Sequence, residues 1–360
     1  MRILYVEPFE GGSHAAFSQA LMGALDAEWT ALTLPGRHWK WRMRGSAAFF
    51  AQEHAATLAR GFDLVVASSY VPLAELVGLA PALAGVPRVL YFHENQLAFP
   101  TLGPGQPRDH HFGFTQLVSA LAADRCVFNS AYNRDSFLEA AAALLRRMPD
   151  AVPKRWVETI RARAEVLGVP QPLTRDPVAP GLAHAQGPLL LWNHRWEHDK
   201  NPATCLRGLA ELADEGARFR VAVCGQRFTR APAVFAELEP RLRSRAVQWG
   251  HAEATTYRCL LDAADVVLST AHHEFFGVSV MEAVHHGARP LVPDRLAYPE
   301  LWPAEFRYAD DDAFVPALRE LLASGRPLRA DRRQLTNPFS VDVLVPRFAR
   351  LFDEVVSTGR

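Results

Sequence analysis

Two glutamates spaced eight residues apart, Glu274 and Glu282, are placed to bind a polar, charged substrate. Residues 265–269 are typical of a short buried strand, and the stretch from Gly277 to Gly287 is typical of a helix that one glycine opens and the other ends. The first amides of a helix have no partner within it, and the helix dipole favours an anion there. This pattern suits a sugar nucleotide, with pyrophosphate on the amides and hydroxyls on the carboxylates. The alternative is structural: Glu274 complements the dipole and Glu282 is a solvated helix residue.

A second pair of charges, Arg195 and Lys200, brackets a loop that follows an expected strand at residues 188–192. A loop in this position lies at the edge of a parallel sheet, where such folds bind their ligands. Two cations there could clamp a pyrophosphate. Ordinary surface charge is the alternative interpretation.

Four consecutive polar residues, His93, Glu94, Asn95 and Gln96, follow the apolar strand predicted at Arg88–Phe92. They stand where a buried parallel strand emerges from the sheet, which favours contact with a ligand. His93 could accept or donate a proton near a reacting hydroxyl, and Glu94 could orient it. A buried core histidine with a capping glutamate would be the structural alternative.

The segment at residues 35–44 alternates cations with aromatic rings between a proline turn and a helix expected to begin near Ser46. Its cations suit phosphates and its rings suit unpaired bases, so we favour a nucleic-acid contact. An edge strand with inward tryptophans and outward cations is the alternative. The residues concerned are Arg37, His38, Trp39, Lys40, Trp41, Arg42 and Arg44.

Two further runs resemble metal sites only superficially. Asp109, His110 and His111 have no second ligand pair at a matching spacing, so we favour helix capping or contact with an acceptor. The acidic residues 310–312 precede an expected helix, where carboxylates complement the dipole. We therefore expect no metal.

The composition describes a globular protein of two α/β domains. The chain has 360 residues, 49% hydrophobic and 22% charged, and strands alternate with helices on both sides of a Pro- and Gly-rich stretch at residues 168–187. The formal net charge is zero, so any binding to nucleic acid or membrane must come from a local patch. Four separated cysteines, no signal-peptide pattern and no membrane-length apolar run favour a cytoplasmic protein without stable membrane association.

Taken together, these motifs resemble those of family 4 glycosyltransferases. The shared features are a Gly-Gly turn after the first strand (Gly11 and Gly12), the HENQ run, Arg-x4-Lys, Glu-x7-Glu with an internal Phe-Gly, and an amphipathic tail. The resemblance implies the GT-B fold: two facing Rossmann-like domains with a cleft between them and a C-terminal helix that crosses back to the first domain. We accordingly expect a first domain at 1–170, a linker at 171–187, a second domain at 188–338 and the crossing helix at 339–360.

The same resemblance implies a donor site and a retaining, metal-free mechanism. Arg195 and Lys200 would neutralise the leaving diphosphate, Glu274 would hold the donor sugar and His93 would lie near the reacting centre. These four are the expected catalytic residues. The expected donor-binding residues are Gly11, Gly12, Gly225, Trp249, Gly250, Phe276, Gly277, Val278, Ser279 and Glu282.

A narrower resemblance rests on the segments PGRHWKWR, FHENQLAFP and NHRWEHDKNP. They are similar to those of the tRNA-queuosine mannosyltransferases, which implies transfer of mannose from GDP-mannose to the queuosine nucleoside of a tRNA anticodon. Residues 37–44, except Met43, together with Glu94, Asn95, Gln96, His110 and His111 would then contact the acceptor RNA. Two alternatives stay open: a lipid or polysaccharide acceptor, and a catalytically idle nucleotide- or RNA-binding module.

Overall fold

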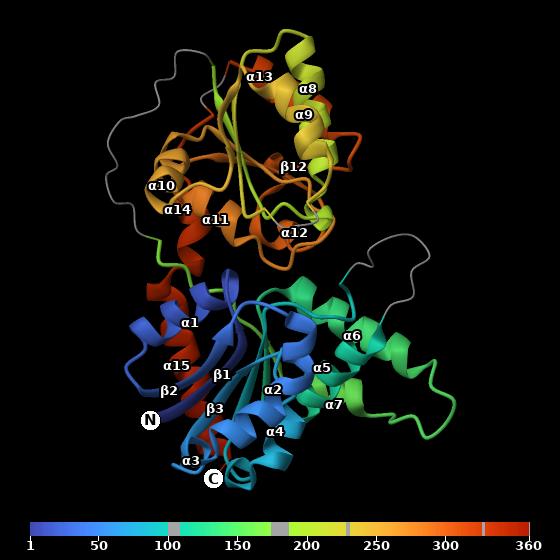
Figure 1. The fold of residues 1–360 in the computed structure, drawn as a ribbon, viewed down its shortest axis with the longest axis vertical. Coiled ribbons are helices and arrows are strands. Elements are labelled where there is room, and N and C mark those ends of the chain that lie inside the picture. Colours follow the sequence, from blue (N-terminus) through green and yellow to red (C-terminus); the bar gives the residue numbers. More distant parts are fainter. Residues whose placement is uncertain (100–108, 174–186, 228–230, 326–327, 360) are drawn as a thin grey trace. The chain divides into compact units, whose positions relative to one another are not determined.

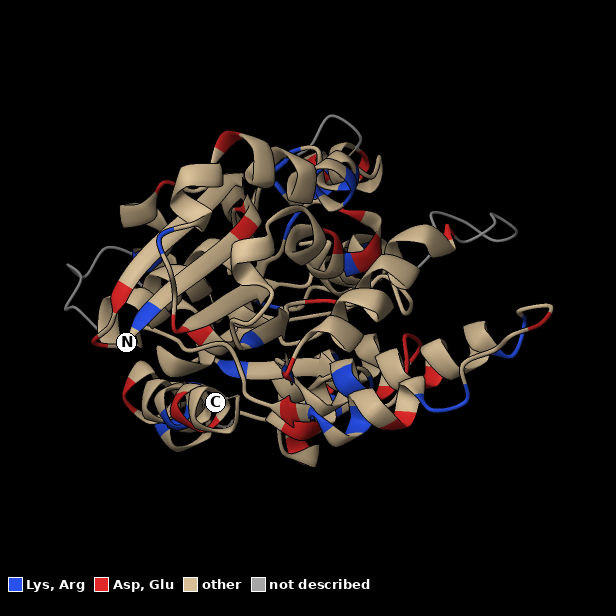
Figure 2. Ribbon diagram, turned by 90° about the horizontal axis from the view of Figure 1, so that it is seen from below, with Lys and Arg blue, Asp and Glu red and all other residues tan. Residues whose placement is uncertain are grey.

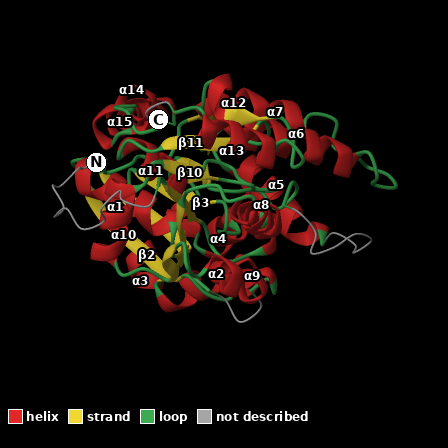
Figure 3. Ribbon diagram, turned by 90° about the horizontal axis from the view of Figure 1, so that it is seen from above, coloured by secondary structure: helices red, strands yellow, loops and turns green. Residues whose placement is uncertain are grey.

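The chain forms two compact units in this computed structural model, which describes residues 1–99, 109–173, 187–227, 231–325 and 328–359. The first unit comprises residues 1–172 and 339–360, and the second comprises residues 173–338. Most of the expected linker, residues 174–186, lies outside the described part. Each unit is a parallel six-stranded sheet with helices, so the expected α/β fold with two Rossmann-like units is confirmed (Figures 1 and 3).

In the first unit the strands lie in the order β2-β1-β3-β4-β5-β6, all parallel. The central strands are buried on both faces, which explains their almost continuous apolar sequence. Helices α1 and α15 pack together, while α2, α4 and α5 form another packed group (Figure 1). The strands are β1 (Arg2–Glu10), β2 (Glu28–Pro35), β3 (Leu64–Ser68), β4 (Arg88–Phe92), β5 (Arg125–Phe128) and β6 (Ala164–Val166). The helices are α1 (Ser13–Ala24), α2 (Trp39–Glu53), α3 (Ala55–Leu58), α4 (Leu73–Leu79), α5 (His110–Ala122), α6 (Ala131–Leu145), α7 (Trp156–Ala162) and α15 (Val341–Thr358).

In the second unit the strand order is β12-β11-β10-β7-β8-β9. Counted from β7, this is the 3-2-1-4-5-6 arrangement of a doubly wound sheet, whose order reverses between β7 and β10. The strands are β7 (Leu189–Asn193), β8 (Arg220–Cys224), β9 (Ala246–Gly250), β10 (Val266–Leu268), β11 (Arg289–Pro293) and β12 (Arg307–Tyr308). The helices are α8 (Pro202–Asp214), α9 (Val234–Leu242), α10 (Ala254–Ala263), α11 (Val278–His285), α12 (Tyr298–Leu301), α13 (Phe314–Ala323) and α14 (Arg333–Thr336).

The C-terminal helix α15 packs on the first unit, as the resemblance implied. Its buried side chains recur every three or four residues from Leu344 to Val355, the spacing of one helix face. Phe348 meets Phe17 of α1 and Tyr91 of β4 at ring-centroid distances of 5.6 and 5.9 Å. The helix thereby supports the strand that leads into the HENQ run.

One expectation about the basic-aromatic segment is wrong. Helix α2 begins at Trp39 rather than near Ser46, so the segment is not an edge strand either. Met43, Ser46, Ala47 and Phe50 are buried at helical spacing, and this apolar face outweighs the alternation of cations and rings in the sequence. Strand β1 extends to Glu10, because it pairs with β2 as far as Pro35 across an irregularity in register.

Charged side chains of both signs are interspersed over the helices (Figure 2), in keeping with the zero net charge. Among the described residues, no helix combines the length and the apolar character that crossing a membrane requires.

Candidate functional site

The second unit brings two loops together at the point where its strand order reverses. One loop follows β7 and contains Asp199 and Asn201, and the other follows β10 and contains Thr270 and His272. The hydroxyl of Thr270 donates to the Asn201 carbonyl at 2.8 Å, and the His272 amide donates to the Asp199 carbonyl at 2.8 Å. A parallel sheet opens a crevice at such a position, so these loops stand where ligands are bound.

Lys200 and Glu274, one on each loop, form a buried ion pair. The Lys200 ammonium lies 3.2 Å from the Glu274 carboxylate and 3.3 Å from that of Asp199, and it donates to the His273 carbonyl at 2.8 Å. Burial, the largest single cause, would raise the pKa of Glu274, but Lys200 together with His194 and His273 outweighs it, and the pKa is lowered to about 2. Burial would lower the pKa of Lys200, but Glu274 and Asp199 raise it. Both groups are therefore charged at neutral pH, and Lys200 is a fixed cation.

The loop that carries Glu274 leads directly into helix α11. Gly277 precedes the helix with a φ of 87°, a left-handed conformation that favours glycine. The helix therefore starts at Val278, and its first amides point out of its N-terminus, where the dipole attracts an anion. The Phe276 amide lies 3.5 Å from the Glu274 carboxylate, and Phe276 itself is buried. The predicted anion-binding stretch is thus next to the fixed cation.

Ser279, in the first turn of α11, contacts residues at the end of β7. Its carbonyl accepts from the Asn193 amide at 2.8 Å, and its hydroxyl lies 3.5 Å from Nδ1 of His194. Burial and the Lys200 charge lower the pKa of His194 to about 4, and Nε2 of this ring lies 3.1 Å from the Leu268 carbonyl. A neutral His194 therefore donates through Nε2, which leaves Nδ1 as an acceptor toward Ser279.

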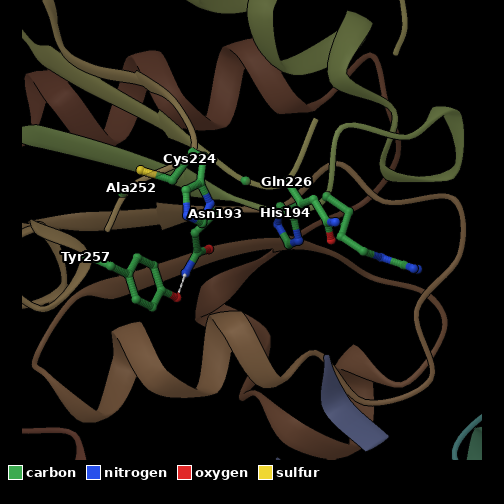
Figure 4. A pocket seen from close by; sticks show the side chains of 9 residues that line it. Asn193, His194, Cys224, Gln226, Ala252 and Tyr257 are labelled. Carbon is green, nitrogen blue, oxygen red and sulfur yellow. Dashed lines mark hydrogen bonds between the residues drawn. The ribbon is translucent and has the colours of Figure 1, made fainter. Parts of the chain in front are cut away.

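Glu282, one turn further along α11, is held by Tyr257 of α10. The Tyr257 hydroxyl donates to the Glu282 carboxylate at 2.8 Å, and the Asn193 amide donates to the Tyr257 oxygen at 3.0 Å (Figure 4). Burial raises the pKa of Glu282, and the bond from Tyr257 opposes that rise. Sequence reasoning missed Tyr257 and Asn193. The edge-of-sheet rule could have found Asn193, which follows directly on an apolar strand, whereas nothing in the sequence marked Tyr257.

A pocket of about 220 Å³ lies beside this group. Figure 4 shows its side chains around the carboxyl ends of β7 and β8. Two of the predicted site residues, Arg195 and Gly225, line it. The full lining is Asn193, His194, Arg195, Cys224, Gly225, Gln226, His251, Ala252 and Tyr257.

The other residues of the second unit that were predicted to bind the donor make contacts within the protein. The guanidinium of Arg195 is half-exposed and pairs with Glu197 at 3.1 Å. A Cβ on Gly225 would lie 1.8 Å from the carbonyl oxygen of His194, so glycine is required where this strand end crosses the β7 loop. The Gly225 amide donates to the Gly250 carbonyl at 3.3 Å, and Trp249 packs edge-on against the buried Trp196.

Asp311 is a further residue that sequence reasoning interpreted differently. Of the acidic run, Asp310 accepts from the amide of Ala313, the N-cap residue of α13, at 3.0 Å, so it stabilises the turn before the helix rather than capping the helix itself. Asp311 instead contacts His272 at 2.7 Å and Arg295 at 2.6 Å. Arg295 also donates to the Ala271 carbonyl at 3.0 Å, so Asp311 fixes the loop that carries Glu274.

In the first unit, His93 lies in a buried group that includes His14 and Glu7. The His14 and His93 rings stack with centroids 3.9 Å apart, and Nδ1 of His14 lies 2.9 Å from the Glu7 carboxylate. Glu7 was not predicted, although a glutamate inside an apolar parallel strand needs a partner and could have been singled out for that reason.

These three residues each offer an atom that could bind a metal, and the three atoms lie within 4.8 Å of one another. The ring planes of His14 and His93 are inclined by only 26°. A metal must lie in the plane of each histidine at about 2.0–2.1 Å, and two stacked, nearly parallel rings cannot both meet that condition. The geometry favours an ion pair beside a neutral ring.

The Gly-Gly turn connects this group to the basic-aromatic segment. Gly12 precedes α1 with a φ of 55°. A Cβ on Gly11 would lie 3.2 Å from the Cα of Gly36, so the turn after β1 packs closely against the turn after β2. His14 follows two residues later, and Arg37 begins the basic-aromatic segment on the other turn.

The other HENQ residues bond mainly within the protein. Glu94 accepts from the Tyr70 hydroxyl and from the Gln96 amide, the latter at 2.8 Å. The Asn95 amide donates to the Asn133 side chain at 2.9 Å, and its oxygen accepts from the Ala98 amide at 2.7 Å. Asn95 therefore shapes the loop.

The start of α2 lies against the start of α5. Trp39 meets Phe112 at 5.2 Å, Lys40 lies over Trp39 at 5.5 Å, and Arg44 lies over Phe112 at 5.2 Å. Trp41 is 67% exposed, a high value for this side chain. The predicted RNA-contacting residues of the two segments are therefore neighbours. Most residues of this group are exposed to solvent: Arg37, His38, Lys40, Trp41, Arg44 and His111. Arg42 is half-buried. His110 lies 3.2 Å from Arg147.

Comparison with known proteins identifies the family of this chain. Residues 2–171 match the model of a family described as the N-terminal part of tRNA-queuosine alpha-mannosyltransferase. A tRNA-queuosine alpha-mannosyltransferase of Drosophila melanogaster is 36% identical over 373 residues, which cover 99% of this chain and 97% of the relative. The chain belongs to the tRNA-queuosine alpha-mannosyltransferase family. The resemblance inferred from the motifs is thus confirmed.

Solved structures related to this family member share its fold. Sucrose-phosphate synthase from Thermosynechococcus elongatus superposes with a TM-score of 0.74 at 14% identity, covering 99% of this chain and all (100%) of that one. The Anabaena protein HepE in complex with UDP superposes with a TM-score of 0.70 at 15% identity, covering 98% and 100%. At this identity the likeness establishes the GT-B fold alone.

Proposed function

We propose that this protein transfers mannose from GDP-mannose to the queuosine nucleoside of tRNA, with retention of configuration. Its membership of the tRNA-queuosine alpha-mannosyltransferase family is the observation that carries the proposal. The geometry of the two units supports it and suggests which groups perform each step.

The second unit supplies the donor site in this proposal. The diphosphate leaves when the bond between the mannose C1 and its phosphate oxygen breaks, and the departing negative charge needs compensation. Lys200, held charged beside Glu274, and the first amides of α11 provide that compensation next to each other. No metal ion or other cofactor is required in this scheme, because a fixed cation and a helix N-terminus supply the positive charge.

The two glutamates then recognise hydroxyls. Glu274 is ionised and accepts hydrogen bonds from the donor sugar, and Glu282 accepts from the ribose. The pocket beside Tyr257 receives the nucleoside, and Arg195 at its border reaches the diphosphate. The acceptor hydroxyl forms the new bond to C1 as the bond to the phosphate oxygen breaks, and its proton passes to the departing diphosphate.

The first unit supplies the acceptor site. The exposed Trp41 suits stacking on an unpaired base, and Arg37, Lys40 and Arg44 suit the backbone phosphates of an anticodon arm. We also propose that the protein acts in the cytoplasm without stable membrane association. Its four cysteines are free thiols, and three of them are buried.

The decisive experiment incubates the protein with labelled GDP-mannose and tRNA that contains or lacks queuosine. We expect label only in the queuosine-containing tRNA, and Lys200→Met should abolish it. Label in an added lipid or polysaccharide would mean that this molecule, and not tRNA, is the acceptor. Donor binding without transfer to any acceptor would mean an idle binding module.

A further inference from the structure

The imidazole ring of His93 is buried. The side chain is 5% exposed, and neither of its ring nitrogens has a partner among the described residues. A neutral imidazole offers one donor and one acceptor, and leaving both unpaired in the interior is costly. Such a group in a native structure calls for an explanation, and a substrate hydroxyl would provide one.

Three rings fix the position of this imidazole. The His14 ring stacks on it at 3.9 Å, Phe17 meets it edge-on at 5.0 Å, and Tyr91 meets it at 4.7 Å and 68°. The first two come from α1 and the third from β4, directly before His93. The ring therefore cannot turn to find another partner without moving α1 or the strand.

Glu7 lies beside His14 and favours its imidazolium form. Glu7 is 0% exposed, and its second oxygen accepts from the Phe9 amide at 2.8 Å. Burial, the largest single cause, would lower the pKa of His14, but Glu7 together with Glu94 and Glu10 outweighs it, and the pKa is raised. A carboxylate in this interior requires a cation, and His14 is the group within hydrogen-bond distance.

The charged His14 ring opposes a second positive charge on its neighbour. Burial is the larger cause that lowers the pKa of His93, and the stacked His14 adds to it. His14 therefore carries the positive charge of the pair, and His93 stays neutral.

We propose that Glu7 and His14 form an electrostatic lock that keeps His93 a neutral hydrogen-bond acceptor for a substrate hydroxyl. Glu7 and His14 are positioning residues, because they act through His93. The inference rests on the proposed mannosyl transfer for the identity of the substrate, and the hydroxyl that reaches His93 is that of the acceptor. The charge distribution within the lock can be measured without any substrate.

The test follows the titration of each histidine ring by NMR with isotope-labelled histidine, in the wild type and in Glu7→Gln. Glutamine keeps the shape of Glu7 and its bond to Phe9 but removes its charge. We expect His14 to titrate above its ordinary pKa in the wild type and to fall by about one unit or more in Glu7→Gln. The pKa of His93 should rise in the same variant, because its charged neighbour is lost.

Glu10→Gln is the matched control. Glu10 lies on the same strand, but its carboxylate bonds to Ser18 rather than to His14. Glu10 is the weakest of the groups that raise the pKa of His14, so this variant should lower that pKa much less than Glu7→Gln does. If Glu7→Gln does not fold, His14→Gln removes the cation directly and should produce the same rise in the pKa of His93.

Kinetics then connect the lock to transfer. In Glu7→Gln the acidic limb of the kcat profile should move to higher pH, because His93 protonates more readily, while KM for GDP-mannose stays unchanged. An ordinary pKa for His14 in the wild type, or titrations that Glu7→Gln leaves unaltered, would overturn the lock. An unmoved acidic limb in an active enzyme would overturn it as well. If the wild type transfers no mannose, the proposed function fails, and the titrations alone decide the lock.

Discussion

The two units place opposite kinds of chemistry on the same kind of scaffold. Each presents its polar side chains at the carboxyl edge of a parallel six-stranded sheet, beside the point where the strand order reverses. The second unit holds a cation and a carboxylate, Lys200 and Glu274, that keep each other charged. The first holds an imidazole, His93, in a setting that keeps it uncharged.

This difference indicates a division of labour. In the proposed reaction, the departing diphosphate needs permanent positive charge, which we assign to Lys200 and the start of α11. The acceptor hydroxyl needs an uncharged partner that is already oriented, which we assign to His93. One kind of scaffold can serve both because function depends on the side chains at the carboxyl edge of the sheet rather than on the fold itself.

The largest effect is expected from Lys200→Met. It leaves Glu274 as an unpaired buried carboxylate, which should lower the free energy of unfolding by about 3–5 kcal/mol and abolish mannosyl transfer. Denaturant unfolding at neutral pH measures the first effect. In the double variant Lys200→Met, Glu274→Gln, much of the stability should return while transfer stays absent. A single variant as stable as the wild type would mean that the pair is not ionised.

A pH series should show the stabilisation that comes from Glu274. Its pKa of about 2 is below that of an unfolded glutamate, so the contribution is fully present above pH ~4.3 and is lost as the pH falls toward 2. The size of the loss should be about 3 kcal/mol. In Glu274→Gln the free energy of unfolding should change less over this interval. If the free energy of unfolding falls equally with pH in both proteins, groups other than Glu274 cause the acid sensitivity.

Tyr257→Phe should weaken donor binding through the support of Glu282. The change removes a hydrogen bond to a carboxylate, worth about 1.5–3 kcal/mol, and leaves the ring in place. Calorimetric titration with GDP-mannose gives the affinity. Tyr132→Phe, a tyrosine of the first unit, is the matched control and should bind the donor normally. If Tyr257→Phe binds GDP-mannose as tightly as the wild type, Glu282 does not bind the ribose.

The smallest effect is expected on the RNA side. Arg37→Glu with Lys40→Glu should weaken tRNA binding about fivefold to tenfold and flatten its dependence on salt. Donor hydrolysis should persist, because neither residue belongs to the second unit. Arg207→Glu with Arg243→Glu reverses two exposed charges of the second unit and should leave tRNA affinity unchanged. If both pairs weaken RNA equally, the basic-aromatic segment has no special role.

Much of the scaffold could be predicted from the sequence because its signals are local. The buried strands β3, β4, β7 and β8 are apolar runs that end in polar residues, and Gly277 marks the start of α11. The motif spacings led to the correct family. These patterns depend on neighbours within a few residues, which a single sequence displays directly.

The pairings between distant residues could not be predicted in this way. Tyr257 reaches Glu282 across 25 positions, and Asp311 reaches His272 across 39, so no spacing connects them. The predicted start of α2 near Ser46 is too late, because the alternation of cations and rings before it is not typical of a helix. The side chains buried from Met43 to Phe50 at helical spacing stabilise a helix that begins at Trp39. Tertiary packing overrides the local pattern at each of these positions.

Donor binding in two variants tests the division of labour most directly. Calorimetric titration with GDP-mannose should show affinity reduced by about 30-fold or more in the double variant Lys200→Met, Glu274→Gln, and unchanged affinity in Glu7→Gln. Equal loss in both variants, or full affinity without the Lys200–Glu274 pair, would contradict the assignment of the donor to the second unit.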